Sequence, residues 1–370
     1  MKAREVIVIG GNHHNTLGVI RALGEKGIAS NLILTTKEKK PFVSYCKYLK
    51  RIVLIPNDET IPQILLDEFR NVDSPPVVIC CSDSSAGMLD SQRHKLISDF
   101  ILPGSDEEGR ISFLMSKKQM SELALKVGMQ IPQTCYGKEI GANPIISLPC
   151  IIKPIVSMKG KKSDIHICHT WDDVQKKVTE VGIDNVQIQH FIDKDYEYQL
   201  IGCSTGKEII IPGVSIIMRP CKGSNTSFLH YIPLIENFCD IDKCKAFVEK
   251  TGYKGLFSLE FLRDKSGEDF FMEINFRNDG NAICVTESGV NLPYIWYLAC
   301  LGEDYRKELD RTVRPVYVMP DLAELKLLLT GRISIFEYIS DLFKTDRFME
   351  YDKNDPKPFW RMVRAKMHLW

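Results

Sequence analysis

The sequence lacks several features that would place it in a class at once. No apolar run approaches the roughly 18 residues of a membrane span, and the N-terminus shows no signal-peptide pattern. The formal net charge is zero, with 48 basic and 48 acidic side chains, whereas nucleic-acid-binding proteins usually carry a basic excess. We therefore expect a soluble, cytoplasmic protein with no transmembrane segment and no nucleic-acid partner.

Paired cysteines of the kind that bind zinc are also absent. The chain has 12 cysteines, but no C-x-x-C pair occurs and most of the thiols lie in apolar segments. Structural zinc sites usually need closely spaced thiols, whereas buried free thiols behave as small hydrophobes. The cysteines therefore indicate free thiols in a reducing compartment.

A dinucleotide fingerprint is missing after the first apolar run. Residues 6–9 are apolar and lead into Gly10-Gly11-Asn12-His13-His14, which does not match G-x-G-x-x-G. A dinucleotide-dependent oxidoreductase is therefore only a weak alternative.

The chain does show a strand–helix alternation at its N-terminus. Ser82-Asp83-Ser84 follows the last apolar strand of this region, at the carboxyl end where doubly wound sheets bind ligands. The alternation predicts a Rossmann-like α/β domain. Its expected strands are 6–9, 31–34, 51–55 and 77–80, and its expected helices are 17–26 and 61–69.

Beyond about residue 113 the pattern changes to a mixed α+β organisation with longer, alternating strands. After residue 290 the pattern predicts mainly helices. The expected strands are 151–152, 186–191, 196–201, 208–217 and 256–262, and the expected helices are 117–127, 171–180, 241–251, 294–300, 322–329 and 334–342.

The most informative segment is Phe270-Phe271-Met272-Glu273-Ile274-Asn275-Phe276-Arg277. Side chains alternate between the two faces of a strand, so Glu273, Asn275 and Arg277 are expected on one face. Magnesium prefers hard oxygen ligands, and a guanidinium binds phosphate or carboxylate through its planar fork. The row predicts a cation and phosphate site.

A second carboxylate precedes this strand. Glu260 lies between the apolar residues Leu259 and Phe261, and only the turn-like run 264–268 separates the two strands. A hairpin would bring Glu260 near Glu273, where two carboxylates repel each other unless a cation joins them. An ordinary exposed strand face is the alternative.

Two lysines and a basic loop complete the pattern. Lys153 ends an apolar strand and needs an anionic partner, and Lys117 opens a helix. Each lysine alone is typical of a surface charge. The run 155–163 is small, flexible and basic, which suits a loop that folds over phosphates, although a solvated turn has the same composition.

The order of these features resembles the ATP-grasp superfamily, over roughly residues 1–300. Lys117 precedes a helix and the segment Gly128-Met129-Gln130-Ile131-Pro132, and Lys153-Pro154 precedes the basic loop. Glu260 and the Glu273–Arg277 run follow. The layout is most similar to the carbamoyl-phosphate-synthase-like and D-aspartate-ligase-like group.

The resemblance implies roles for individual residues. It implies that Lys153 and Arg277 are catalytic, with Arg277 stabilising the transferred phosphoryl group. It implies that Glu260, Glu273 and Asn275 bind two Mg²⁺ ions, with Mn²⁺ as an alternative. Residues 189–192 would form the hinge that reads adenine, although many members carry an acidic residue at the position of Gln189. The implied ATP-binding residues are Lys117, Lys153, Lys159, Gly160, Gln189, His190, Phe191, Ile192 and Glu197.

The resemblance also implies the domains and the reaction. A Rossmann-like domain of residues 1–112 would precede a two-lobed ATP-grasp domain of residues 113–302, with lobes of about 113–190 and 191–302. A helical segment of residues 303–370 would follow. The implied activity is an ATP- and Mg²⁺-dependent carboxylate–amine ligase that forms an acyl phosphate, acting on amino acids, peptides or cell-envelope precursors. A homodimer is one option.

The sequence gives the weakest evidence for the substrate-binding residues. A basic, hydroxyl-rich run could hold a substrate carboxylate through Arg219, Lys222 and Ser224, and a polar hairpin loop is an equal alternative. A non-catalytic ATP-binding protein of the same fold is a further alternative, against which the retained carboxylates and Lys153 argue. A bicarbonate-activating carboxylase would normally need a biotin partner or further domains.

Overall fold

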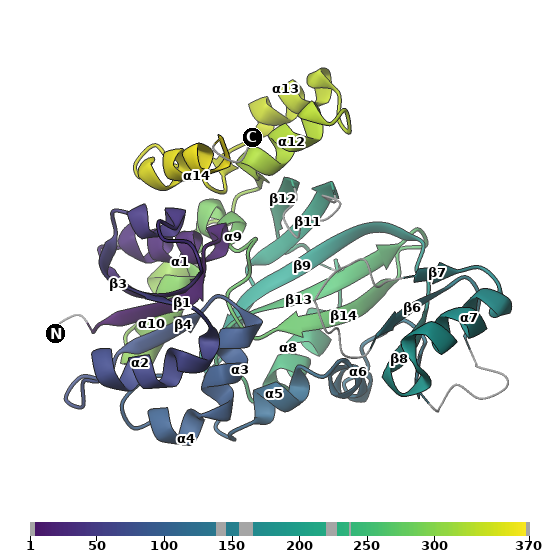
Figure 1. Ribbon diagram of the computed structural model, residues 1–370, viewed down its shortest axis with the longest axis horizontal. Coiled ribbons are helices and arrows are strands. Elements are labelled where there is room, and N and C mark those ends of the chain that lie inside the picture. Colours follow the sequence, from purple (N-terminus) through teal and green to yellow (C-terminus); the bar gives the residue numbers. More distant parts are fainter. Residues whose placement is uncertain (1–3, 138–145, 155–165, 220–227, 237, 368–370) are drawn as a thin grey trace. The chain divides into compact units, whose positions relative to one another are not determined.

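The computed structural model describes residues 4–137, 146–154, 166–219, 228–236 and 238–367 (Figure 1). The chain forms two compact units, and each unit is built from segments that are not consecutive in the sequence. The larger unit comprises residues 1–116, 198–259 and 274–370, and the smaller unit comprises residues 117–197 and 260–273. The predicted domain bounds remain a prediction.

The N-terminal part of the larger unit is the expected parallel sheet. Its strand order is β3-β2-β1-β4, and β1 pairs in parallel with both β2 and β4. Both faces of the central strand are buried, as expected for a sheet covered by helices on both sides. The elements are β1 (Val6–Gly11), α1 (His14–Gly24), β2 (Ser30–Thr35), β3 (Leu49–Ile55), α2 (Ile61–Glu68), β4 (Val77–Cys80), α3 (Asp83–Ser91), α4 (Arg93–Leu96) and α5 (Arg110–Leu114).

A second sheet has the strand order β14-β13-β9-β11-β12-β15-β16, with β10 paired to β9. The single strand expected at 208–217 is instead two strands, β10 and β11. Pro212 lies between them and has no N–H for a ladder. The elements are β9 (Lys194–Ser204), β10 (Ile209–Ile210), β11 (Gly213–Arg219), β12 (Phe228–Pro233), α8 (Ile241–Thr251), β13 (Gly255–Asp264), β14 (Asp269–Asn275), β15 (Val316–Met319) and β16 (Arg347–Phe348).

The smaller unit contains a third sheet of order β5-β8-β6-β7. Its core is a small apolar cluster that includes Ile152, Ile188 and Val174. The elements are α6 (Lys117–Lys126), β5 (Thr134–Tyr136), β6 (Cys150–Pro154), β7 (His166–Cys168), α7 (Trp171–Val181) and β8 (Val186–His190). The mixture of parallel and antiparallel sheets confirms the predicted α/β and α+β class.

The C-terminal part of the chain is mainly helical, as expected, but it also supplies β15 and β16 to the second sheet. No helix of the described residues combines the length and apolar content that crossing a bilayer requires. The described cysteines are free thiols, and most are buried. The helices are α9 (Ile283–Ser288), α10 (Leu292–Leu301), α11 (Arg306–Leu309), α12 (Asp321–Leu329), α13 (Ile335–Lys344) and α14 (Lys357–Met367).

Candidate nucleotide and metal site

A chain of hydrogen bonds crosses three adjacent strands of the smaller unit. Lys153 Nζ on β6 donates to Gln189 Oε1 on β8 at 3.0 Å, and Gln189 Nε2 donates to Thr134 Oγ1 on β5 at 2.9 Å. Gln189 is only 5% exposed. Because both ends of the amide are bonded, the Lys153 ammonium group has a defined position on the sheet.

Among the described residues, the negative charge near Lys153 does not balance its positive charge. Its pKa is lowered from 10.5 to about 8, first by burial and then by the positive charge of Lys117, while the Glu273 carboxylate opposes the change. The three predicted residues are therefore electrostatic neighbours within the smaller unit. An anionic ligand would supply the missing negative charge and restore the ammonium form.

The two predicted carboxylates lie on adjacent strands, Glu260 on β13 and Glu273 on β14, and both are partly buried. The hairpin is held by an edge-on contact of Phe261 and Phe271, with ring centroids 5.7 Å apart. The expected turn is present, with Asp264 N donating to Glu268 O at 3.0 Å.

The segment predicted as the adenine hinge has two of its backbone donors engaged. His190 N donates to Gln133 O at 2.8 Å, and Phe191 N donates to Pro149 O at 3.0 Å. Glu197, one of the predicted ATP-binding residues, forms an ion pair with Lys194. The roles of residues 189–192 and of Glu197 stay predictions.

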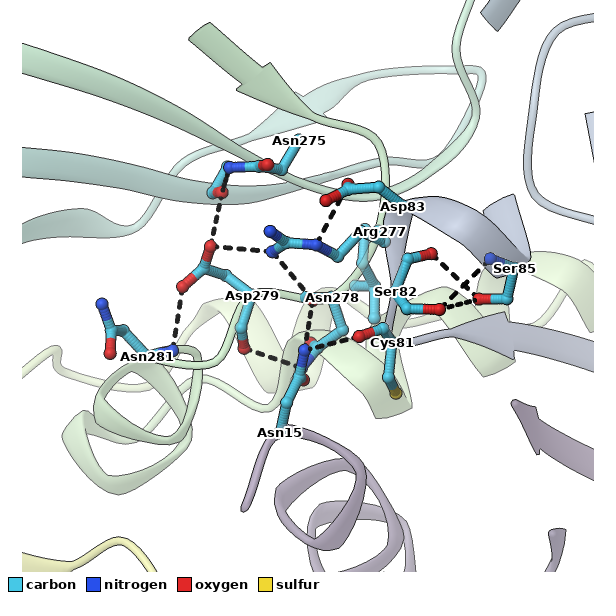
Figure 2. A network of polar contacts seen from close by, with 12 residues as sticks. Asn15, Cys81, Ser82, Asp83, Ser85, Asn275, Arg277, Asn278, Asp279 and Asn281 are labelled. Atoms are coloured by element: carbon cyan, nitrogen blue, oxygen red, sulfur yellow. Dashed lines mark hydrogen bonds and ion pairs between the residues drawn. The ribbon is translucent and has the colours of Figure 1, made fainter. Parts of the chain in front are cut away.

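A polar network in the larger unit surrounds Asp279 (Figure 2). Asp279 Oδ2 accepts hydrogen bonds from Ser258 Oγ at 2.8 Å and from Arg277 Nη1 at 2.9 Å. Asp279 Oδ1 accepts from the backbone N of Asn281 at 2.9 Å. Asn275 Nδ2 donates to Ser258 Oγ at 3.2 Å, so the same hydroxyl orients the amide of the predicted metal ligand.

Arg277 is positioned by two carboxylates rather than by a strand. Strand β14 ends at Asn275, so the predicted alternation does not extend to Arg277. Its Nε lies 3.2 Å from Asp83 Oδ1, at the start of α3, and its Nη1 binds Asp279 (Figure 2). The carboxyl end of β4 therefore contributes Asp83 to the network.

Asn15 links this network to the N-terminal sheet through hydrogen bonds. Asn15 Nδ2 donates to the carbonyl oxygens of Cys81 at 3.0 Å and Asn278 at 2.8 Å, and Asn278 Nδ2 donates back to Asn15 Oδ1 at 2.6 Å (Figure 2). The sequence alone predicts no role for Asn15 or Ser258. A polar residue within the apolar run Phe257-Ser258-Leu259 was the available signal for Ser258.

No family model and no curated protein matches the chain. Solved structures do match. An L-amino acid ligase from Bacillus licheniformis has a TM-score of 0.64 at 14% identity, covering 85% of this chain and 79% of that chain. The biotin carboxylase domain of the Hydrogenobacter thermophilus 2-oxoglutarate carboxylase, a dimer in complex with MgADP, ADP and bicarbonate, has a TM-score of 0.63 at 17% identity, covering 86% and 74%. N5-carboxyaminoimidazole synthetase from Staphylococcus aureus has a TM-score of 0.63 at 15% identity, covering 82% and 79%.

The chain has the ATP-grasp fold. The resemblance found in the motif order is thereby confirmed at the level of the fold. It extends over more than four fifths of the chain in each of these matches.

The donor types of the predicted metal residues suit magnesium. Within the described residues, no three His, Cys, Asp or Glu side chains cluster as a self-contained metal site. Glu260 and Glu273 of the smaller unit offer carboxylate oxygens, and Asn275 of the larger unit offers an amide oxygen. Magnesium commonly takes one or two carboxylates and completes its shell with substrate phosphates and water. The chemistry of these donors therefore fits magnesium.

Arg219, a predicted substrate residue, is already engaged in ion pairs. Arg219 Nη1 binds Glu324 at 2.6 Å, and its Nη2 forms an ion pair with Asp341. Both carboxylates belong to the C-terminal helices, so the guanidinium already has structural partners. Lys222, Ser224, Lys159 and Gly160 lie outside the described residues.

Proposed function

We propose that the protein is an ATP- and Mg²⁺-dependent ligase that joins a carboxylate to an amine. The observation that carries this proposal is the lowered pKa of Lys153, whose positive charge is not fully balanced by its described neighbours. Among the described residues, a half-buried lysine whose pKa is lowered by a second lysine and opposed by the Glu273 carboxylate is suited to a polyphosphate. The ATP-grasp fold supports the same conclusion.

The reaction follows from the chemistry of carboxylates. A carboxylate oxygen attacks the γ-phosphorus of ATP, the bond to the β–γ bridging oxygen breaks, and ADP leaves. The amine then attacks the carbonyl carbon of the acyl phosphate, inorganic phosphate leaves, and the nitrogen gives up a proton. Protein help in such transfers is largely positioning and electrostatics.

Each charged residue has a role in that scheme. Lys117 and Lys153 bind the phosphates of ATP. Arg277, fixed by Asp83 and Asp279, stabilises the transferred phosphoryl group. Glu260, Glu273 and Asn275 would hold Mg²⁺, which would neutralise charge on the phosphate oxygens.

The structural relatives support a ligase without naming the substrates. An L-amino acid ligase, a biotin carboxylase domain in complex with MgADP and bicarbonate, and an N5-carboxyaminoimidazole synthetase share the fold. The low identities leave the carboxylate and the amine open.

The test is ADP release with Mg²⁺, ATP and mixtures of amino acids, dipeptides and sugar acids, with hydroxylamine added to trap an acyl phosphate as a hydroxamate. We expect substrate-dependent ADP release in the wild type. Glu273→Gln should remove it, because the substitution takes a charge from the proposed metal site.

Glu268→Gln is the matched control, because Glu268 lies in the same hairpin but is exposed at the turn. It should release ADP like the wild type. Nucleotide binding with no substrate-dependent turnover across the whole panel would favour a non-catalytic nucleotide-binding protein. Equal turnover in Glu273→Gln would contradict the metal assignment.

A further inference from the structure

Ser258 contacts two important members of the polar network in the larger unit, although it carries no charge. The residue belongs to β13 and is completely buried. Its Oγ donates to Asp279 Oδ2 at 2.8 Å and accepts from Asn275 Nδ2 at 3.2 Å, and both of these partners are buried as well. One small side chain therefore joins a predicted metal ligand to the carboxylate that binds Arg277.

The single proton of the Ser258 hydroxyl fixes the direction of both hydrogen bonds. Asp279 Oδ2 also accepts from Arg277 Nη1 at 2.9 Å, and Asp279 Oδ1 accepts from the backbone N of Asn281 at 2.9 Å. A carboxylate paired with a guanidinium in this way can only accept hydrogen bonds. The hydroxyl proton is therefore committed to Asp279, and only the lone pairs of Oγ remain for Asn275.

This commitment also fixes the orientation of the Asn275 amide. In the orientation observed, Nδ2 donates to a lone pair of Ser258 Oγ. Rotating the amide by half a turn would place Oδ1 against the same lone pairs with no proton between the two oxygens, which leaves buried polar groups without a hydrogen bond. The amide oxygen of Asn275 is therefore held on the side of the amide that points away from Ser258.

The same proton count favours an amide over a carboxylate at position 275. Aspartate has the shape of asparagine, but its two oxygens are both acceptors when it is ionised. It would compete with Asp279 for one hydroxyl proton and would bring a second negative charge to a buried hydroxyl. Asparagine instead supplies a donor for Ser258 and keeps an oxygen for a cation.

We propose that Ser258 is a positioning residue for the proposed ligase, which orients the Asn275 amide oxygen for Mg²⁺, and that Asp279 enforces this orientation by taking the hydroxyl proton. The assignment rests on the proposed function, because it requires Asn275 to be a magnesium ligand. Groups that hydrogen-bond to a metal ligand typically contribute about tenfold to hundredfold to metal affinity. Ser258 would act on the ion through Asn275 alone.

The test compares the affinity of the full chain for a non-hydrolysable ATP analogue in Mg²⁺ with its affinity in a chelator, by calorimetry. The ratio of the two affinities isolates the contribution of the metal from that of the nucleotide. Ser258→Ala removes the hydroxyl, and we expect the ratio to fall roughly tenfold. The affinity in the chelator should stay at the wild-type value, which a general loss of folded structure would not allow.

Three further variants separate orientation from packing. Ser258→Thr keeps the hydroxyl and should retain the wild-type ratio. Asp279→Asn keeps the shape of the carboxyl group, but its amide can donate to Ser258 as well as accept. The hydroxyl proton is then no longer committed, so the ratio should fall although Ser258 is intact. Ser215→Ala is the control, because it removes a completely buried serine from β11 of the same sheet and should retain the ratio.

The outcomes separate this proposal from the ligase proposal. A Mg²⁺ effect that is lost in Glu273→Gln but unchanged in Ser258→Ala overturns the role of Ser258 and leaves the proposed function intact. Equal falls in Ser258→Ala and Ser258→Thr, or in Ser258→Ala and Ser215→Ala, assign the effect to packing and also overturn that role. A wild type whose affinity does not respond to Mg²⁺ contradicts the metal assignment of the proposed function, and this proposal with it.

Discussion

Arg21 Nε donates to Asp355 Oδ2 at 3.0 Å, and both side chains are almost completely buried, with exposures of 2% and 1%. Arg21 Nη2 also donates to the backbone oxygen of Asp355 at 2.8 Å. The pair joins α1 to the segment before α14, which lies more than 300 residues further along the chain. The C-terminal segment is therefore fastened through buried charge as well as apolar packing.

Breaking this pair should destabilise the protein strongly. Asp355→Ala leaves the Arg21 guanidinium buried without its counter-charge, and such losses cost about 3–5 kcal/mol. The measurement is the free energy of unfolding of the larger unit from denaturant titration. Lys50→Ala, which removes the exposed pair with Glu5, is the control and should cost at most about 1 kcal/mol. Equal losses in the two variants would contradict a structural role for the Arg21–Asp355 pair.

Removing the Lys153 charge should weaken ATP binding while the fold is retained. Lys153→Met keeps the apolar stem but deletes the ammonium group that Gln189 positions at 3.0 Å. Hydrogen bonds to charged groups are worth about 1.5–3 kcal/mol, so we expect roughly tenfold to hundredfold weaker binding by calorimetry. Lys126→Met, at the exposed end of α6, should bind ATP like the wild type. A wild-type affinity in Lys153→Met would remove this lysine from the phosphate site.

ATP binding should also take up protons near pH 8. The pKa of Lys153 is lowered from 10.5 to about 8 in the free protein, so about half of the side chains are neutral at that pH. Bound phosphates favour the ammonium form and raise this pKa, so binding draws a proton from the buffer and affinity falls as pH rises above about 8. Calorimetry in buffers of different ionisation enthalpy measures the uptake. Lys153→Met should show none from this group, and an identical uptake in the variant would assign it elsewhere.

The fold was largely predictable from the sequence because its signals are local. The apolar runs of β1 and β4 and the alternation around Glu273 identified their strands within a few residues. The contacts that place Arg277 were not predictable. They come from Asp83 and Asp279, which the chain separates by almost 200 residues, and from the early end of β14. Pro212 is a sequence signal for the break between β10 and β11. The long apolar run on both sides of this proline instead favoured one continuous strand.

The carboxylate nearest to His14 was equally hidden, since Glu350 lies at the other end of the chain. Contacts with distant carboxylates are properties of tertiary packing, which is why none of these carboxylates belonged to the predicted site.

A carboxyl pair at the start of α12 should make stability depend on pH. Asp321 N donates to Glu350 Oε2 at 3.2 Å, and Asp321 Oδ2 accepts from Glu350 N at 2.8 Å. Burial, together with the Glu350 carboxyl group, raises the pKa of Asp321 from 3.8 to about 8. The folded protein thus prefers a protonated Asp321, whereas the unfolded chain ionises it at its ordinary pKa.

The sign of the effect follows from that difference. A group whose folded pKa is raised contributes stability that is complete below its unfolded pKa, and this contribution is lost as pH rises to the folded pKa. The free energy of unfolding should therefore decline between about pH 4 and about pH 8 relative to Asp321→Asn, which keeps the size and the acceptor oxygen but cannot ionise. Denaturant titrations of both proteins across that range give the difference directly. Parallel profiles would show that Asp321 ionises at its ordinary pKa in the folded protein, and a wild type that gains stability with pH relative to the variant would reverse the assigned direction.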